Sequence, residues 1–347
     1  MIYAPIIIPT MCRATHFIRL VESLKRNSWA CYTDVYVGLD YPPSEKYEKG
    51  WTEICKYLEK SDFSVFKKFI VFKRDVNLGA PKNSAALVQY VQAHYDRWIQ
   101  TDDDCEFSKN FLEYMDKCLY EFEEDENIFA VTGYSYPLDW NVDNAATCFS
   151  QNFNVAMWGT GFWREKRVRA DRFVRSGEML GKVKDCVNKR SYECMLDACL
   201  VEYVRAAVAM RKPWLMTKMT DVALRAYLAI ENKYCISPVI SKVRNYGFDG
   251  SGQFCINASE TDGDISAQKY DYENQVIDGL DFFELVLDKD ESHLSDNRKK
   301  LNNFDSRPQE DVLYVRRLVW LIAHLGLNCA KIYHYVGALF RRMRKIP

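Results

Sequence analysis

Short apolar runs alternate with stretches of helical periodicity through the first hundred residues. Strands are predicted at 6–8, 35–39, 69–72 and 97–101. Between them, apolar residues recur three or four positions apart at 17–24, 51–58 and 87–94, which predicts helices. Strands that alternate with helices favour the α/β class, with a mainly parallel, doubly wound sheet covered by helices on both faces.

Polar residues follow each predicted strand. In open parallel sheets the ligand site lies beyond the carboxyl ends of the strands, where the loops enter the helices. The strand ends carry Thr10 and Arg13, Asp40, Arg74 with Asn77, and Asp102 to Asp104. The pattern therefore predicts a ligand site at this edge.

The three consecutive aspartates are the strongest local signal. Two unit charges ~4 Å apart repel by about 4 kcal/mol at an effective dielectric near 20, and a cation would relieve that repulsion. Magnesium or manganese held by one or two carboxylates completes its shell with water and substrate phosphates. The alternative is a solvated acidic turn that leads to a helix cap at Ser108.

Composition narrows the function classes. The 347 residues suffice for a large domain with an appendage or for two domains, and 48% hydrophobic with 27% charged residues is ordinary for a globular protein. Lys and Arg total 47 against 48 Asp and Glu, so the chain has no global positive field to attract nucleic acid.

The twelve cysteines are scattered and form no Cys-x-x-Cys pair. This spacing favours free thiols in a reducing compartment over disulfides or zinc ligands. We find neither a secretory signal nor an apolar run long enough to span a bilayer, and the expectation is a cytoplasmic protein.

Neither a Gly-x-Gly-x-x-Gly nor a P-loop motif occurs in the first unit, so a glycine-rich loop does not cradle phosphates there. The segment 101–112, Thr-Asp-Asp-Asp-Cys-Glu-Phe-Ser-Lys-Asn-Phe-Leu, resembles the Glu-Asp-Asp-x-x-x-Ser-Pro-Asp-Phe-Phe segment of GT-A glycosyltransferases, which contains their Asp-x-Asp region.

The resemblance extends over about residues 4 to 255 and includes inverting members of the N-acetylglucosaminyltransferase I type. The similar segments are 4–13, 39–40, 77–83, 130–134, 156–163, 220–221, 236–238 and 245–253. Two departures stand out: Asp102 takes the place of a common Glu, and Phe254 follows Gln253 where relatives often have a His near the metal or diphosphate.

The resemblance implies a GT-A fold and a division of the chain. Residues 1–255 would form the catalytic domain, with a nucleotide and metal half at 1–134 and an acceptor half at 135–255. A polar irregular extension is expected at 256–310 and a basic amphipathic helical tail at 311–347.

The implied activity is metal-dependent transfer of a hexosyl or N-acetylhexosaminyl group, with inversion, from a nucleoside-diphosphate sugar, here a UDP-sugar, to a hydroxyl of a glycan or lipid-linked oligosaccharide. Asp104 and Asp102 would hold Mn²⁺ or Mg²⁺. The nucleotide-sugar residues would be Thr10, Arg13, Asp40, Arg74, Asn77, Lys82, Asn83, Asp102 and Asp103.

Individual roles follow from side-chain chemistry. Asp40 can accept a hydrogen bond from a uracil ring, or it can cap the next helix. Arg13 can pair with the base or the phosphates, and Lys82 or Arg74 can offset diphosphate charge unless they are solvated surface groups.

The resemblance gives Asp221 the role of general base, which inverting transfer needs near the acceptor hydroxyl. Asp221 can equally be a helix N-cap, because 222–225 has a helical pattern; Glu193 and Asp197 are in reserve.

Sugar contacts are expected from Trp158, Gly159, Trp163, Gly250 and Ser251. Indole faces can support a sugar ring, although either tryptophan can belong to an aromatic core. Glycines at 247, 250 and 252 permit a loop that closes over the donor, or an ordinary turn.

An apolar stripe from Leu318 to Leu339 precedes the basic cluster Arg341–Lys345. Such a helix binds anionic membrane surfaces, which predicts a peripheral protein at the inner membrane face; it can also pack on the catalytic domain or on a second copy in a homodimer.

Two other functions stay open. Sugar-nucleotidyltransferases also use carboxylate-held metal, but their first loop is glycine-rich and Pro9–Arg13 lacks glycine. A catalytically silent sugar-binding or scaffold protein is the non-enzyme alternative.

Overall fold

The computed structural model describes residues 2–176, 178, 182, 220–252 and 275–304, and scattered positions between 317 and 333. The chain forms two compact units. The first comprises Met1–Gln151, Ala156–Lys166 and Cys235–Asn297, and the second comprises Asn152–Val155, Arg167–Tyr234 and Arg298–Pro347.

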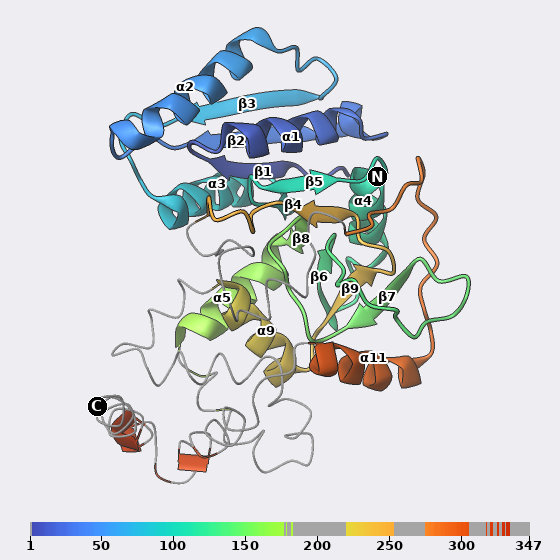
Figure 1. Ribbon diagram of the computed structural model, residues 1–347. Helices are drawn as coiled ribbons and strands as arrows, with labels where there is room; N and C mark the ends of the chain where they lie inside the picture. Colours follow the sequence, from blue (N-terminus) through green and yellow to red (C-terminus); the bar gives the residue numbers. More distant parts are fainter. Residues whose placement is uncertain are drawn as a thin grey trace, which may run out of the picture. The chain divides into compact units, whose positions relative to one another are not determined.

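Figure 1 shows the described helices and strands and labels most of them. In chain order they are β1 (Ile6–Thr10), α1 (Ala14–Lys25), the 3-10 helix η1 (Ala30–Tyr32), β2 (Asp34–Leu39), α2 (Glu45–Lys60), β3 (Lys68–Lys73), α3 (Ala80–His94), β4 (Arg97–Gln100), β5 (Cys105–Phe107), α4 (Phe111–Glu121), β6 (Ile128–Thr132), β7 (Cys148–Gln151), β8 (Thr160–Trp163), α5 (Arg164–Ser176), α9 (Thr220–Glu231), β9 (Tyr234–Pro238), β10 (Val243–Asn245) and α11 (Glu291–Phe304).

The main sheet has the strand order β3-β2-β1-β4-β8-β6-β9-β7. Strands β3, β2, β1 and β4 pair in parallel, whereas β8 runs antiparallel to β4 and β6, and β7 runs antiparallel to β9. The predicted α/β class and its parallel, helix-covered half are confirmed, and the antiparallel pairs extend this sheet on the β8 side.

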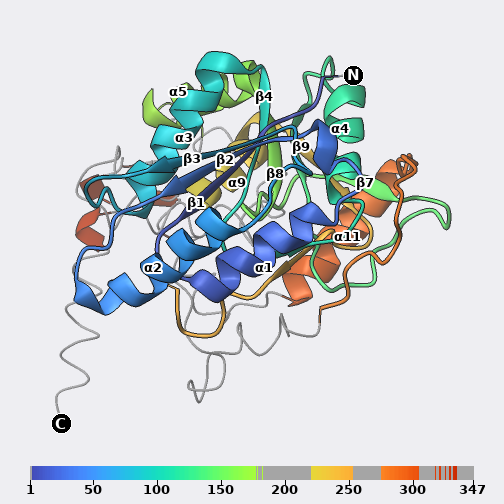
Figure 2. The same cartoon turned by 90° about the horizontal axis from the view of Figure 1, so that it is seen from above.

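Helices α1 and α2 cover one face of the parallel strands and α3 covers the other, as Figure 2 shows. Because both faces are covered, every residue of β2 is buried, which explains why such strands appear in the sequence as nearly continuous apolar runs. Strand β3 lies at the sheet edge and is only half-buried.

A second, two-stranded sheet forms between β5 and β10, which pair antiparallel from Phe107↔Val243 to Cys105↔Asn245. Lys242, next to β10, forms a buried ion pair with Asp278, whose carboxylate also accepts from the side chain of Asn110 at 3.0 Å. These contacts hold β10 beside the residues that follow β4.

The extension predicted to be irregular at 256–310 contains helix α11. Asn297 and Leu301, four residues apart, are each 1% exposed, so the helix buries a narrow face that its polar composition concealed. Asp288 donates its backbone N–H to Cys148 of β7 at 2.8 Å. Residues 256–274 and 305–310 lie outside the described set, as does most of the predicted tail at 311–347.

Two further sequence predictions can be compared with the described residues. The cysteines among them are free, as predicted. No helix in the described part of the chain has the length and hydropathy needed to cross a membrane.

Helix α4 contains a buried carboxylate that makes the stability of the fold depend on pH. Asp116 is fully buried, and its Oδ1 accepts from the backbone N–H of Ala4 at 2.8 Å. Burial raises the pKa of Asp116 to about 7, against the opposing charge of Arg97. Because the folded pKa exceeds the unfolded value, the contribution of Asp116 to the free energy of unfolding is largest below about pH 4 and is lost as the pH rises to about 7.

We therefore expect Asp116→Asn, which keeps an acceptor and carries no charge, to remove this pH dependence. The parent should lose about 2–3 kcal/mol of unfolding free energy between pH 5 and pH 8, and the variant much less. Urea denaturation at both pH values measures it, with the exposed Asp281→Asn as control. An unchanged pH slope in Asp116→Asn would show that Asp116 is not the group responsible.

Candidate active site

The predicted strand-end residues meet at one edge of the parallel strands. Residue Thr10 is in register with Leu39, and Leu39 with Lys73. The backbone hydrogen bonds between the strands continue past these positions. Asp40 donates its N–H to the carbonyl of Thr10 at 2.9 Å, and Arg74 donates its N–H to the carbonyl of Leu39 at 2.9 Å. The backbone hydrogen bonds thus fix where the loops after β1, β2 and β3 begin.

Arg13 bridges two of the three consecutive aspartates. Its guanidinium pairs with Asp103 Oδ1 through Nη2 and with Asp104 Oδ2 through Nη1, the latter at 2.8 Å. Thr10 donates its hydroxyl to the other oxygen of Asp103 at 2.7 Å. The side chains are 20% exposed for Arg13, 7% for Asp103 and 8% for Asp104, so this ion group is largely removed from water.

Burial and pairing act in opposite directions on these groups. Burial raises the pKa of Asp103, and the positive charge of Arg13 works against that rise. For Arg13, burial would lower the pKa, but the carboxylates of Asp103 and Asp104 raise it above its usual value. The guanidinium therefore stays charged and supplies the cation that the repulsion between the aspartates requires.

Strand β10 completes the group from the far side of the sequence. Asn245 donates from Nδ2 to Asp104 Oδ1 at 3.2 Å, and the backbone N–H of Tyr246 donates to the carbonyl of Asp104 at 2.8 Å. A Cβ at Gly247 would come within 2.2 Å of Asp104 Oδ2. Only glycine fits beside this carboxylate.

Sequence reasoning missed His16, which lies in the first turn of α1. Its Nε2 is 3.1 Å from the carbonyl of Tyr246 and 3.2 Å from Asp249 Oδ2. Ser251 donates its backbone N–H and its hydroxyl to Asp249 Oδ1. The available signal was the spacing of three residues from Arg13, which puts both side chains on one side of the helix start.

Asp40 is hydrogen-bonded to the turn before α3. Its Oδ1 accepts from the N–H groups of Leu78 and Tyr41 at 2.8 and 3.0 Å, and its Oδ2 accepts from Gly79 at 2.8 Å and from Asn77 Nδ2 at 3.4 Å. These four bonds use the acceptor positions of the carboxylate. Asp40 thus fixes the turn before α3, and its contact with a uracil ring stays a prediction.

The other residues expected at the nucleotide separate into buried and exposed groups. Asn83 is 1% exposed and links two elements, donating to the carbonyl of Gly38 at 2.7 Å and accepting from Arg74 Nε at 3.2 Å. Lys82 is exposed on the first turn of α3. Asn83 is thus a framework residue, whereas Lys82 remains accessible.

The two tryptophans have different environments. Trp163 is 4% exposed, donates its indole N–H to the carbonyl of Leu119 and lies under Lys166, so it belongs to the core and cannot support a sugar. Trp158 is half-buried and meets the ring of Phe248 edge-on at 6.1 Å. Only Trp158 therefore adjoins the glycine-rich segment after β10.

The three remaining sugar-site predictions fall on loops. Gly159 is buried with φ 68°, and a Cβ there would lie 2.9 Å from the ring of Phe111. Packing thus accounts for this glycine. Gly250 and Ser251 are exposed, and Gly250 has φ 80°.

Asp221 lies in the first turn of α9, in the second unit. The reserve candidates Glu193 and Asp197 lie outside the described residues, as does Phe254. The assignment of the general base thus remains a prediction.

The carboxylate oxygens of the aspartates after β4 are suitable ligands for a divalent ion. Asp102 is half-buried beside the fully buried pair, and Asp102 and Asp104 offer the hard oxygen ligands that Mg²⁺ and Mn²⁺ prefer. Asp104 Oδ1 contacts a neutral amide, and Oδ2 lies so close to Gly247 that a Cβ there would come within 2.2 Å. Arg13 already pairs with that oxygen.

Four parallel strands in the order β3-β2-β1-β4, with an acidic turn directly after β4, form the parallel nucleotide-binding half that the sequence predicts, and antiparallel strands extend the sheet beyond it. The described residues form a mixed α/β fold around an eight-stranded sheet. No protein-family model and no curated protein matches the sequence.

Several solved structures are similar to this chain at low sequence identity. The mannosyltransferase PcManGT from Pyrobaculum calidifontis, in complex with GDP-Man and Mn²⁺, is 13% identical with a TM-score of 0.38, over 66% of this chain and 74% of that one. S. aureus TarS 1–349 is 11% identical with a TM-score of 0.40, over 96% and 92%. TarS 1–349 with UDP-GlcNAc is 16% identical with a TM-score of 0.33, over 50% and 48%.

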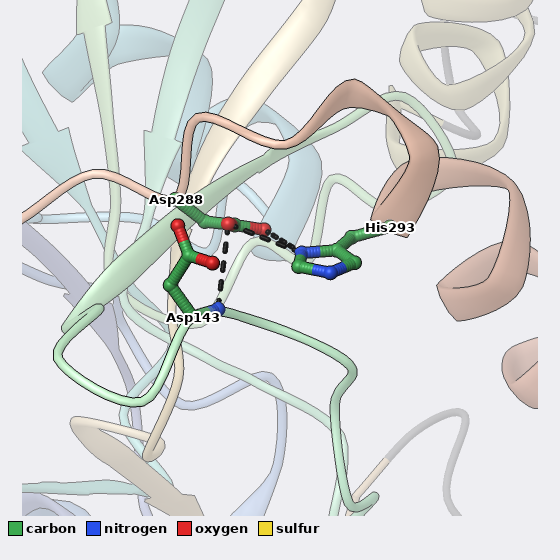
Figure 3. A group of neighbouring side chains, drawn as sticks. All are labelled: Asp143, Asp288 and His293. Atoms are coloured by element: carbon green, nitrogen blue, oxygen red, sulfur yellow. Dashed lines mark hydrogen bonds and ion pairs between the residues drawn. The ribbon is translucent and has the colours of Figure 1, made fainter.

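A second polar group, Asp143, Asp288 and His293, has ligand atoms that all lie within 4.8 Å of one another (Figure 3). His293 Nδ1 is 3.0 Å from Asp288 Oδ2, and Asp288 raises the pKa of the imidazole. The backbone N–H of Asp143 lies 3.4 Å from Asp288 Oδ1. The contact of the imidazole with a buried carboxylate, and of that carboxylate with Asp143, accounts for the group as a link between α11 and the loop before β7.

Gly247 provides a direct test of the candidate site. We expect Gly247→Ala to displace the carboxylate of Asp104 and to weaken binding of UDP with Mn²⁺ at least tenfold, because the new methyl group overlaps Oδ2. Isothermal titration calorimetry measures the affinity, and a thermal melt checks the fold.

The matched control is Gly279→Ala, where an added Cβ meets nothing within 4 Å. It should bind like the parent. If Gly247→Ala retains parental affinity, Asp104 does not contribute to a nucleotide site.

Proposed function

We propose that the protein is a metal-dependent glycosyltransferase that moves a sugar from a UDP-sugar to a hydroxyl of a glycan or lipid-linked oligosaccharide, with inversion. The observation that carries the proposal is the buried Arg13–Asp103–Asp104 group at the carboxyl edge of the parallel strands, completed by Asn245 and Gly247. Ligands of open α/β sheets bind at this edge.

The charges of the group suit a nucleoside diphosphate. A guanidinium pairs with phosphate oxygens in two-pronged geometry, so Arg13 can bind the diphosphate. Asp102 and Asp104 would hold Mn²⁺ or Mg²⁺, which supplies positive charge to the leaving diphosphate when it is bound. Thr10 keeps Asp103 in place through its hydroxyl.

The segment after β10 suits the sugar side of the donor. Trp158 and Phe248 present aromatic rings beside exposed Gly250 and Ser251. Closure of this segment over the donor would exclude water and favour transfer over hydrolysis. Arg74 and Lys82 remain candidates for the outer charge of the diphosphate.

Transfer with inversion needs one base. In the proposal, Asp221 accepts the proton of the acceptor hydroxyl while that oxygen attacks the anomeric carbon and the nucleoside diphosphate leaves. Asp221 lies in the first turn of α9, which begins at Thr220.

Partners of the tail belong to the proposal as well. Leu325 and Ile332 are 56% and 63% exposed and lie seven residues apart, which is one face of a helix. An anionic membrane surface at the inner face or a second copy of the chain would cover such a face.

The function is tested by a transfer assay with UDP-hexose, UDP-N-acetylhexosamine and GDP-mannose donors, with Mn²⁺ and a panel of glycan acceptors. We expect UDP release that depends on acceptor and metal, and its loss by at least 100-fold in Asp104→Asn, which removes the carboxylate charge. Metal-independent turnover or an unaffected variant would contradict the assignment.

A second experiment addresses the base. Asp221→Asn keeps the shape and removes the basicity, so kcat should fall by roughly two to four orders of magnitude while donor affinity changes little. Glu193→Gln and Asp197→Asn are the matched comparisons. Activity of Asp221→Asn within a few-fold of the parent would transfer the role to one of those two residues.

A further inference from the structure

The carboxylates that would hold the metal are already paired with a cation of the protein. We propose that Arg13 is an internal counter-cation that keeps a divalent ion off Asp104 until a diphosphate draws the guanidinium away. The inference rests on the proposed function, because it concerns the order in which metal and nucleotide enter that site.

All four carboxylate oxygens of the pair have partners in the structure. Asp103 Oδ1 pairs with Arg13 and Oδ2 accepts from Thr10. On Asp104, Oδ2 pairs with Arg13 at 2.8 Å and Oδ1 accepts from Asn245 at 3.2 Å. A metal ion that binds Asp104 alone must therefore compete with the guanidinium or with the amide.

The guanidinium is the stronger competitor for two reasons. It carries a full charge beside a carboxylate that is 8% exposed, where electrostatic interactions exceed those in water. A divalent ion bound next to the guanidinium would be repelled by its positive charge, because both cations would lie in the same enclosed site. Asn245 and the close backbone at Gly247 limit the approach from the other side.

A diphosphate changes this balance because it offers the guanidinium a second anion of matching geometry. Thr10 and Asp103 would keep their hydrogen bond, so Asp103 stays oriented while Arg13 turns to the phosphates. Asp104 then becomes available, and metal and nucleotide strengthen each other's binding. By linkage the coupling is reciprocal.

The test is a titration of the full-length protein with Mn²⁺ alone. Binding is measured by the electron paramagnetic resonance signal of free manganese and by calorimetry. We expect Arg13→Met to bind Mn²⁺ at least tenfold more tightly than the parent and to bind UDP at least tenfold more weakly. These opposite changes would not result from a general loss of structure.

Arg19→Met is the matched control, since this guanidinium of α1 stacks on the ring of Tyr246 at 3.9 Å and should leave Mn²⁺ affinity unchanged. Removing Arg13 leaves two buried carboxylates without a counter-charge and can unfold the chain. The double variant Arg13→Met with Asp103→Asn removes one of those charges too, and it should show the same gain in Mn²⁺ affinity. Adding Asp104→Asn should abolish that gain.

Two other results would separate the inference from the function. If the parent binds UDP with Mn²⁺ but both Arg13 variants bind Mn²⁺ no more tightly than the parent, the counter-cation role is wrong and the proposed function stands. If the parent fails to bind UDP with Mn²⁺, the proposed function fails and the inference with it.

Discussion

The guanidinium of Arg13, held between the carboxylates of Asp103 and Asp104, is the interaction on which this edge of the molecule depends. Removing one partner from a buried ion group costs about 3–5 kcal/mol, because the remaining charge stays out of water. Here one cation serves two adjacent anions that are each less than a tenth exposed. The loop after β1 and the turn after β4 are thereby fixed relative to each other.

The pairing of β10 with β5 brings a third segment to the same place. It sets Asn245 and Gly247 against Asp104, and it continues into the residues that contact His16 and Trp158. The carboxylate is thus enclosed by groups from distant parts of the sequence. This enclosure strengthens its electrostatic interactions and leaves the glycine-rich segment next to the proposed donor position.

Much of this arrangement could be predicted from the sequence. The strands and helices of the parallel half follow from periods of two and of three to four residues, and the strand-end polar residues follow from the topology of parallel sheets. The cation that pairs with the three consecutive aspartates could not be predicted in this way. Charge repulsion indicated that a cation was needed, but both an external metal and a neighbouring Arg13 satisfy that requirement, and only the folded chain shows Arg13 in place.

Other differences have local causes. The Asp40 carboxylate meets backbone N–H groups of a turn that lies 38 residues onward, a contact with no periodic signal. Trp163 lies on a central strand with every residue buried, so alternation could not reveal its environment. The three-residue strands β5 and β10 pair across more than a hundred residues, and segments this short carry little propensity of their own.

A crystal structure of the full-length protein with UDP and Mn²⁺, with anomalous diffraction to place the manganese, would show which groups surround Asp104 and Arg13 when both ligands are bound. We expect an anomalous peak at coordination distance from Asp104 and from the diphosphate, with the guanidinium of Arg13 turned to phosphate oxygens. Nucleotide bound away from the β1 and β4 ends, or manganese absent while Arg13 still bridges Asp103 and Asp104 beneath a bound diphosphate, would contradict this expectation.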